Sequence, residues 1–271
     1  MCFRHTDKGA TLRIVRFAVL GRTRYGLAEG DVVRSLLRSP FSRFKGPGGS
    51  FRLDGGVHPL AAVKLLAPCL PSKIVCLGLN YRSHAEETKL PIPSVPLIFL
   101  KPSTAVIAPD EPIVLPADAR RVDYEGELGV VIGKRAKSVP VSRVGEYVLG
   151  YTCINDVTER HVQKEDGQWT RAKSYDTFAP LGPWIETDLV PNDVKVETYL
   201  NGEVRQSART SDLIFGVAQL VSFISGVMTL LPGDVIATGT PAGIGRMKPG
   251  DTVEVRIEGI GALRNPVLGS R

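Results

Sequence analysis

The stretch Tyr124-Glu125-Gly126-Glu127-Leu128-Gly129-Val130-Val131-Ile132-Gly133 decides how the rest of the chain is organised. Successive side chains of a β-strand point to opposite faces, so Glu125 and Glu127 fall on one face and the apolar residues fall on the other. The next apolar run, residues 147–154, leads to Asp156. If the two strands are neighbours, three carboxylates meet at one place, where they repel one another unless protons or a cation compensate them.

A site built only from carboxylate oxygens favours a hard cation, with Mg²⁺ or Mn²⁺ before Ca²⁺. Water or substrate would fill the remaining coordination positions, as in an open catalytic site. A Glu-x-Glu pattern on a half-buried strand is, however, more often the solvated face of that strand. The motif alone therefore leaves both interpretations open.

The composition is that of a globular protein with a sizeable core: 271 residues, 43% hydrophobic and 23% charged. The sequence has no apolar run long enough to cross a bilayer, and residues 1–16 lack the apolar core of a signal peptide, so we expect a soluble, cytoplasmic protein without a membrane partner. The four cysteines show no paired spacing, which agrees with a reducing compartment. We expect Cys76 and Cys153 in the core, and the other two are Cys2 and Cys69.

The net charge of +6 is concentrated in residues 1–52, which hold eleven Lys or Arg against three Asp or Glu. A nucleic-acid interface would combine basic residues with interleaved aromatic residues or a known motif. Instead, several arginines alternate with apolar residues, as on the outer face of a hairpin. These are Arg13, Arg16, Arg22 and Arg24. We therefore expect a solvated face and no nucleic-acid partner.

Short strand patterns with glycine turns dominate the N-terminal part. They occupy residues 12–17, 25–28, 32–33 and 63–68, with a Gly/Pro/Ser-rich loop at 39–50. From residue 73 the apolar runs become longer. The sequence therefore predicts a small β-rich module at 1–70 and a catalytic domain at 71–271.

A short helix is predicted at residues 81–89, with Asn80 as its N-cap. His84 and Glu87 are three residues apart and share one face of this helix. A carboxylate beside an imidazole fixes the tautomer of the ring and raises its basicity, so the pair could activate a water molecule. A His/Glu pair on a protein surface is nevertheless commoner than a catalytic one.

Further elements follow the carboxylate strands. We predict a hairpin over 194–206 with a type I′ turn at Asn201-Gly202, a long helix at 212–231 and a strand at 247–257. The glycine-rich segment 233–245 matches neither nucleotide-binding loop pattern, and its backbone amides and Thr240 are better suited to approach an anion. Arg160, Gln163 and Lys173 supply donors for an anionic, oxygen-rich ligand.

Six motifs, in this order, resemble the fumarylacetoacetate hydrolase family. They are residues 78–87 (GLNYRSHAEE), 99–102 (FLKP), 124–128 (YEGEL), 155–156 (ND), 171–174 (RAKS) and 238–245 (TGTPAGIG). The resemblance runs from about residue 74 to the C-terminus and implies an α+β, mainly β fold: a mixed, largely antiparallel β-roll with few helices, usually a homodimer. The N-terminal module is much less diagnostic.

The resemblance also implies roles for individual residues. Glu125, Glu127 and Asp156 match the family's Mg²⁺ or Mn²⁺ ligands, with Ca²⁺ also possible. His84 and Glu87 match its water-activating dyad, on a segment that can form a lid in relatives. The implied catalytic lysine and substrate contacts are Lys173, Arg160, Gln163, Thr240 and Tyr81, with Thr177 as a further contact.

The implied reaction is the metal-dependent hydrolysis of a C–C bond in an acylpyruvate-type substrate, a small anionic 2-oxo acid, through a metal-bound enolate. His84 would deprotonate a water and Lys173 would stabilise the oxyanion. The family also contains isomerases, tautomerases and decarboxylases of related dicarboxylates, so these reactions remain alternatives.

Overall fold

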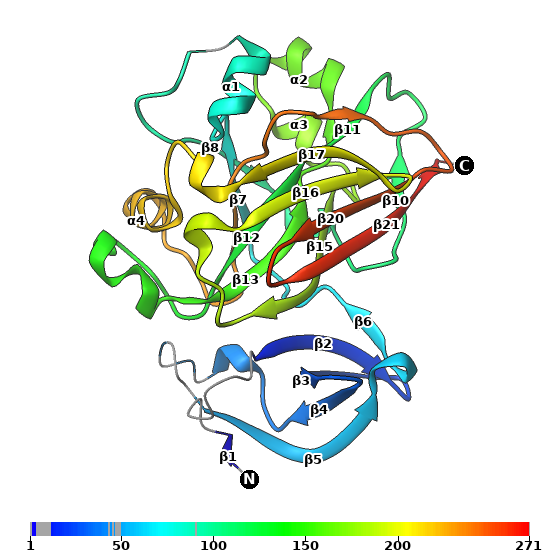
Figure 1. Cartoon of the computed structure of the whole chain (residues 1–271), viewed down its shortest axis with the longest axis vertical. Helices are drawn as coiled ribbons and strands as arrows, with labels where there is room; N and C mark the ends of the chain where they lie inside the picture. The colour runs from blue at the N-terminus through cyan, green and yellow to red at the C-terminus, as the bar shows by residue number, and fades with distance from the viewer. Residues whose placement is uncertain are drawn as a thin grey trace.

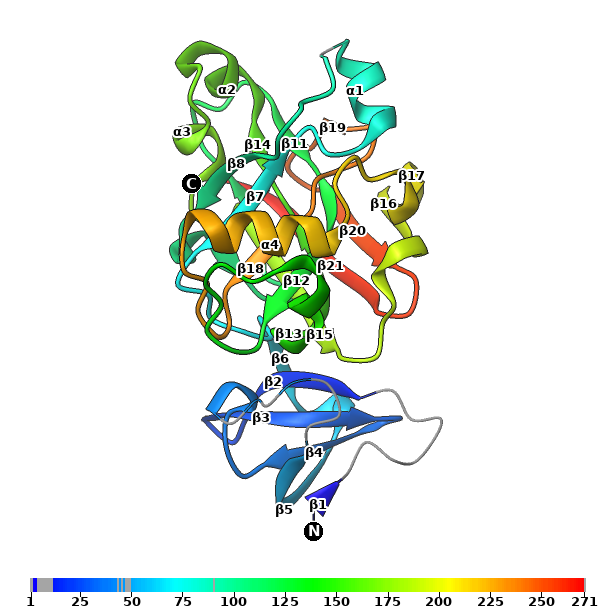
Figure 2. The ribbon, with the colours of Figure 1, turned by 90° about the vertical axis from the view of Figure 1, so that its left-hand side faces the viewer.

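The computed structural model describes residues 2–3, 12–42, 44, 46, 50–89 and 91–270. It has a small, strand-rich part built from the N-terminal residues and a larger part above it (Figure 1). The helices α1 (Arg82–Thr88), α2 (Arg160–Asp166) and α3 (Thr170–Lys173) lie at the end of the larger part that is remote from the small one (Figures 1 and 2). The prediction of a mainly β, α+β fold is confirmed.

One sheet of thirteen strands runs through both parts of the molecule, in the order β1-β5-β4-β3-β2-β15-β13-β12-β18-β7-β8 with β6 beside β2 and β9 beside β15. The two parts join where Ile14 pairs with Ile185. The strands of this sheet are β1 (Cys2–Phe3), β2 (Arg13–Val19), β3 (Arg22–Glu29), β4 (Val32–Leu36), β5 (Phe51–Pro59), β6 (Lys64–Leu66), β7 (Ile74–Gly78), β8 (Leu97–Lys101), β9 (Val106–Ile107), β12 (Gly126–Ile132), β13 (Val148–Asn155), β15 (Ala179–Glu186) and β18 (Val235–Ala237).

Two smaller sheets complete the larger part. The first consists of β10 (Ile113–Leu115), β21 (Gly261–Gly269), β20 (Thr252–Ile257), β16 (Lys195–Leu200) and β17 (Glu203–Arg209), and the second of β14 (Thr158–Glu159), β11 (Val122–Tyr124) and β19 (Gly245–Arg246). Most pairs are antiparallel, but β7 with β18, β9 with β15 and β10 with β21 are parallel. The sheets are therefore mixed, as predicted.

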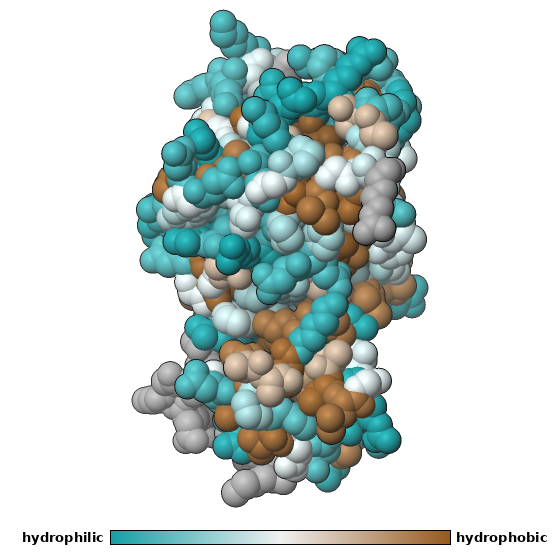
Figure 3. All heavy atoms as spheres, turned by 90° about the vertical axis from the view of Figure 1, so that its right-hand side faces the viewer, coloured by the Kyte–Doolittle hydropathy of each residue, from teal (hydrophilic) through white to brown (hydrophobic). Residues whose placement is uncertain are grey.

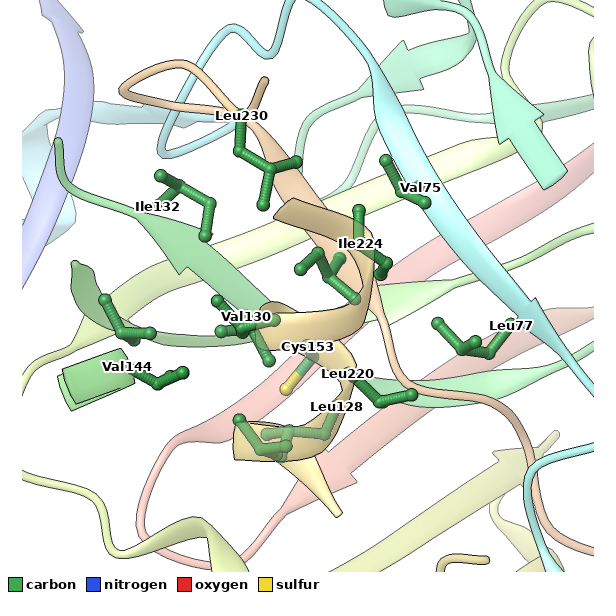
Figure 4. Close-up of a cluster of buried hydrophobic side chains, with 14 of the residues drawn as sticks. Val75, Leu77, Leu128, Val130, Ile132, Val144, Cys153, Leu220, Ile224 and Leu230 are labelled. Atoms are coloured by element: carbon green, nitrogen blue, oxygen red, sulfur yellow. The ribbon is translucent and has the colours of Figure 1, made fainter. Parts of the chain in front are cut away.

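The main core lies between β12 and the helix α4 (Val217–Val227). Leu128, Val130 and Ile132 of β12 belong to this cluster, together with Leu220 and Ile224 of α4 (Figure 4). Because side chains alternate along the strand, Glu127 projects from the opposite face. Val131, on the same face as Glu127, packs into a second hydrophobic cluster, so both faces of β12 hold the strand in place and only the end near Glu127 carries polar groups.

The predicted helix at 212–231 is too long. The helix α4 begins only after Gly216, because the preceding segment is bonded to Asn80: the N–H of Ile214 donates to the Asn80 backbone O, and the N–H of Phe215 donates to Asn80 Oδ1. Beyond its end, Leu230 pairs with Ala136 in an isolated β-bridge. These long-range contacts override the apolar periodicity that continued on both sides of α4.

The sequence predicted Asn80 as the N-cap of α1, but the structure shows that Asn80 does not cap this helix. Its side chain donates instead to the carbonyls of Phe215 (3.1 Å) and Thr238 (2.7 Å), and Tyr81 occupies the N-cap position without a side-chain cap. The predicted strand at 247–257 is also too long, because β20 begins only at Thr252. The hairpin β16–β17 is confirmed, with positive φ at both Asn201 and Gly202.

The N-terminal hairpin β2–β3 is present, but its arginines do not share one face. Arg16 lies opposite Tyr25 whereas Arg24 lies opposite Phe17, so these two arginines point to opposite sides of the sheet. Strand β5 was not predicted, because Gly55 and Gly56 interrupt its pattern. Part of the predicted loop at 39–50 lies outside the described residues, as does the Cys2 side chain.

Cysteines 76 and 153 are buried and free, which confirms their place in the core. The domain boundary near residue 70 stays a prediction; β6 ends at Leu66 and β7 begins at Ile74. The short 3-10 helices are η1 (Pro40–Ser42), η2 (Leu60–Ala62), η3 (Ser103–Ala105), η4 (Val141–Glu146), η5 (Pro191–Asp193) and η6 (Thr210–Asp212).

The surface is mainly hydrophilic on the face seen in Figure 3, with separate hydrophobic patches on the larger part and near its junction with the small one. None of the described helices combines the length and apolar character that a bilayer crossing requires.

Candidate active site

Three carboxylates converge at one end of the β12–β13 pair. Gly126 pairs with Asn155, and the N–H of Asp156 donates to the carbonyl of Glu125 (2.8 Å). This register places Asp156 beside Glu125 and close to Glu127. One ligand oxygen from each of Glu125, Glu127 and Asp156 lies within 4.8 Å of the others, and all three residues are buried. The structure thus brings together the three acidic residues that the sequence had singled out.

Each carboxylate has one oxygen held by a fixed partner outside the group. Glu125 Oε1 accepts from the Arg160 guanidinium. Glu127 Oε2 accepts from the N–H of Gly239 (2.6 Å), and Asp156 Oδ1 accepts from Lys101 Nζ (2.6 Å). The strands, a loop and two cationic side chains therefore fix the orientation of all three groups.

The second oxygens of Glu125 and Asp156 share a partner, Lys173. Lys173 Nζ lies 2.8 Å from Glu125 Oε2 and 2.6 Å from Asp156 Oδ2. Glu127 Oε1 is buried and has no hydrogen-bond partner within the described part of the chain. A buried carboxylate oxygen without a donor is costly, so this atom marks a place where a ligand is expected.

The electrostatics of the group are uneven. Burial raises the pKa of Glu127, and the neighbouring Asp156 and Glu125 raise it further, to well above its usual range. Burial also disfavours ionised Glu125, but Lys173 and Arg160 more than offset that effect and lower its pKa. One carboxylate is thus left undercompensated, and a divalent cation would remove this imbalance.

The residues fit a divalent cation by these criteria. The donors are all oxygen, the set is buried and preoriented, and one donor atom lacks a partner. Carboxylate-only sets are typical of Mg²⁺, Mn²⁺ and Ca²⁺, not of Zn²⁺. The carboxylate cluster, meaning Glu125, Glu127 and Asp156, could therefore hold such an ion.

Helix α1 carries the predicted dyad. His84 Nδ1 lies 2.9 Å from Glu87 Oε2, and the second oxygen of Glu87 accepts from the N–H of Gly243 (3.0 Å). Since an ionised carboxylate only accepts hydrogen bonds, this pattern assigns the ring proton to Nδ1 and leaves the Nε2 lone pair free. The imidazole is buried, with its side chain 11% exposed, whereas Glu87 lies at the rim with 37%.

The loop from Thr238 to Gly245 connects the dyad with the carboxylate cluster. Its Gly239 N–H bonds Glu127 and its Gly243 N–H bonds Glu87. Gly243 has φ of +97°, and a Cβ there would lie 2.1 Å from the carbonyl oxygen of Arg205, so only glycine fits. One loop thus forms a common wall for both groups.

The predicted substrate contacts have different surroundings. Tyr81 is fully buried, and its hydroxyl has no partner among the residues described. Arg160 donates to Gln163 Oε1 (2.8 Å), which leaves the amide nitrogen of Gln163 available. The Thr240 hydroxyl already donates to the carbonyl of Gly126 (3.0 Å) and accepts from Gln206 (2.8 Å), so its proton is not free for a ligand.

Thr177 is engaged elsewhere, because its Oγ1 accepts from the N–H of Val114 in β10 (2.9 Å). In contrast, several buried polar atoms that have no partner within the described ranges are found in residues of the site or next to them in the chain. These are Tyr81 OH, Ser83 Oγ, Glu127 Oε1, Asn155 Nδ2, Ser174 Oγ and Thr238 Oγ1. Such a concentration is expected where water or a ligand completes the hydrogen bonds.

Sequence reasoning assigned no role to three residues that support the site. Lys101 and Asp123 are fully buried, and Asp123 accepts from Arg160 Nε (3.0 Å). The Trp169 ring lies edge-on to the Phe99 ring, and their centroids are 5.2 Å apart. The backbone carbonyl of Trp169 accepts a hydrogen bond from the N–H of Lys173 (3.0 Å). The signal for Lys101 was available, since it is a charged residue at the end of an otherwise apolar run.

Comparison with known proteins gives two family matches. Residues 73–268 match the model described as fumarylacetoacetate (FAA) hydrolase C-terminal, and residues 12–68 match the model described as Rv2993c-like, N-terminal. Together they cover most of the chain.

Three similar proteins carry informative names. The 5-carboxymethyl-2-hydroxymuconate delta-isomerase of Mycobacterium smegmatis is 49% identical with a TM-score of 0.88, over 95% of this chain and all of that one. The oxaloacetate tautomerase Fahd2a of Rattus norvegicus is 39% identical, over 78% of this chain and 71% of its own. The maleylpyruvate hydrolase of Sphingobium sp. SYK-6, solved with manganese(II) and pyruvate, is 32% identical with a TM-score of 0.79, over 96% of this chain and all of that one.

Proposed function

From the premise that this chain belongs to the fumarylacetoacetate hydrolase family, we propose that it is a divalent-metal-dependent enzyme that hydrolyses a C–C bond in a small, acylpyruvate-type 2-oxo acid. The observation that carries this proposal is the His84–Glu87 hydrogen bond. It gives the site an oriented base that is not part of the carboxylate cluster. Proton transfer and cation binding can therefore be performed by separate groups.

Glu125, Glu127 and Asp156 would hold the cation, which we expect to be Mg²⁺ or Mn²⁺. When bound, such an ion acts as a Lewis acid towards the oxygens of a 2-oxo acid. The relative solved with manganese(II) and pyruvate supports this assignment. Arg160, with its charge already directed at the cluster, would attract the anionic substrate and neutralise its carboxylate.

In the hydrolytic reaction, His84 Nε2 takes a proton from water while Glu87 holds the opposite nitrogen as a donor. The hydroxide formed attacks the carbonyl remote from the carboxylate, and Lys173 stabilises the oxyanion. When this adduct collapses, the C–C bond beside the attacked carbon breaks, the acyl part leaves as a carboxylic acid, and the departing pyruvate carbon takes the proton from His84. Burial of His84 and Lys173 strengthens these charge interactions by excluding water. A base in this role contributes on the order of 10² to 10⁴ in rate.

Isomerisation or tautomerisation is the second candidate, favoured by the names of the relatives at 39% and 49% identity. His84 would then move a proton between carbon and oxygen of the substrate instead of deprotonating water. The same charged groups would stabilise the enolate character of the transition state. The predicted homodimer and cytoplasmic location stay predictions.

The two candidates are separated by turnover of acetylpyruvate and of enol-oxaloacetate, each with Mn²⁺ or Mg²⁺ and again after chelation. Hydrolysis predicts metal-dependent release of pyruvate from acetylpyruvate, lost in His84→Ala. His161→Ala, which changes an exposed histidine of α2, is the matched control. Rapid enol-oxaloacetate conversion without pyruvate release would favour the tautomerase. Failure of both substrates with either ion would contradict the proposed function.

A further inference from the structure

Lys101 is a fully buried lysine that none of the proposed steps uses. It ends strand β8, where Pro102 follows, and its side chain has no exposed surface. Its Nζ lies 2.6 Å from Asp156 Oδ1 and 2.9 Å from the carbonyl oxygen of Val157. Both partners belong to the segment that presents Asp156 to the carboxylate cluster.

A buried charge of this kind is poorly explained by stability alone. Removing an ammonium group from water is costly, and apolar residues of similar volume often replace a buried ion pair without loss of stability. The Nζ of Lys101 is occupied by Asp156 and by the Val157 carbonyl, and Asp156 is the only one of these partners that belongs to the carboxylate cluster. We therefore consider the effect of Lys101 through Asp156.

The contact with Lys101 gives the two Asp156 oxygens different hydrogen-bond partners. Oδ1 accepts from Lys101 Nζ, whereas Oδ2 accepts from Lys173 Nζ. Glu125 and Glu127 also have one oxygen each on a partner outside the cluster. Arg160 donates to Glu125 Oε1, and the N–H of Gly239 donates to Glu127 Oε2. Each carboxylate therefore has one oxygen committed to a partner outside the cluster. Of the other three oxygens, those of Glu125 and Asp156 contact Lys173, and that of Glu127 has no partner among the described residues.

The number of oxygens offered by each carboxylate affects which cation a site prefers. Mg²⁺ is small, demands near-octahedral geometry and keeps several water molecules. Ca²⁺ accepts more oxygen ligands and often takes both oxygens of one carboxylate. A set of three carboxylates restricted to one oxygen each favours the smaller ion and leaves positions for water and substrate.

We propose that Lys101 is a positioning residue that restricts Asp156 to a single ligand oxygen and so makes the site prefer Mg²⁺ or Mn²⁺ to Ca²⁺. This inference rests on the metal site of the proposed function. It adds a determinant of metal choice in a residue that lies outside the cation-binding set.

The test measures the dissociation constants of Mg²⁺, Mn²⁺ and Ca²⁺ by calorimetry in the native chain and in Lys101→Met, which keeps most of the aliphatic stem. Loss of the positive charge strengthens binding of all three ions, so the informative quantity is the ratio of the Ca²⁺ to the Mg²⁺ constant. We expect this ratio to fall on the order of 10-fold in the variant, the scale of effects from groups that orient metal ligands.

The matched control is Lys73→Met. Lys73 forms an ion pair with the buried Asp234 that shares no residue with the carboxylate cluster. This variant should leave the ratio unchanged even if it destabilises the chain. A ratio that is unchanged in Lys101→Met, or shifted equally in both variants, would overturn the proposal.

A second measurement does not depend on the variant folding. In a crystal structure of the native chain with Mn²⁺, Asp156 should bind through Oδ2 alone with Oδ1 on Lys101, and two Asp156 oxygens on the ion would overturn the inference. If the native chain binds none of the three ions, the metal site itself is wrong and the inference falls with it. Binding with an unaltered ratio overturns only the role of Lys101.

Discussion

The backbone N–H of Gly243 donates a 3.0 Å hydrogen bond to Glu87 Oε1, while Glu87 Oε2 faces His84 Nδ1. Glu87 therefore links helix α1 to the loop that also holds Glu127. The base and the carboxylate cluster are aligned by one backbone segment. Disturbing that link should affect the chemistry before it affects the fold.

Glu87→Gln tests the orientation of the base. Glutamine keeps an oxygen for Gly243, but its amide NH₂ donates to His84 Nδ1 and moves the ring proton to Nε2. We expect turnover of acetylpyruvate to fall on the order of 10² to 10⁴, with little change in KM. Steady-state kinetics check this, with exposed Glu86→Gln as the control. A Glu87→Gln enzyme as active as the native chain would exclude the assigned tautomer.

Divalent cations should stabilise the native chain against heat through Glu127. A ligand present at about one hundred times its dissociation constant adds roughly 2.7 kcal/mol, or roughly 5–10 °C in a protein of this size. Differential scanning fluorimetry with Mn²⁺, and again after chelation, measures the shift. Glu127→Gln should lose it, whereas Glu146→Gln, on the exposed Arg143–Glu146 pair, should keep it. A shift retained in Glu127→Gln would place the ion elsewhere.

Gly78→Ala should displace Trp169 and with it the segment that carries Lys173. A Cβ at Gly78 would lie 2.5 Å from the Trp169 ring. We expect a loss of stability of about 1–3 kcal/mol, the usual cost of overpacking, together with a lower kcat. Urea unfolding and Trp169 emission, measured in a Trp184→Phe background, report both effects. Gly226→Ala, where a Cβ meets nothing within 4 Å, should be neutral or stabilising.

The sequence predicted the local part of the site well and the long-range part poorly. Strand alternation predicted that Glu125 and Glu127 lie together, and helical spacing paired His84 with Glu87, because both patterns depend only on neighbours in the chain. The two glutamates do lie together, although Glu125 falls between β11 and β12 and not within a strand. The Lys101–Asp156 contact spans 55 residues and leaves no such pattern. The same limit explains the length of α4, whose start depends on bonds from the remote Asn80.

Stability should depend on pH through Glu186, at the junction of β15 and β2. Burial raises its pKa, although the Asp188 N–H and the half-exposed Arg13 act in the opposite direction. A carboxyl whose folded-state pKa is raised contributes stability fully below its unfolded pKa, and this contribution is lost as pH rises through the folded value. Native stability should therefore fall relative to Glu186→Gln between acidic and neutral pH.

Urea unfolding of both chains across this pH range measures the difference. Glu203→Gln, which changes an exposed carboxyl, should run parallel to the native chain. A Glu186→Gln protein that is less stable than the native chain at neutral pH would contradict this prediction. The ion pair with Arg13 would then outweigh the effect of burial, although an ion pair with a solvent-screened partner is expected to contribute little stability.

The pairing of β2 with β15 has a consequence for truncated chains. In a chain shortened to the fumarylacetoacetate hydrolase match at residues 73–268, this side of β15 would be an unpaired edge. The backbone N–H and C=O groups beside Ile185 could then pair with a strand of another molecule. Such an edge promotes aggregation and strand exchange. By pairing with this edge of β15, strand β2 covers backbone groups that would otherwise be open to strand exchange.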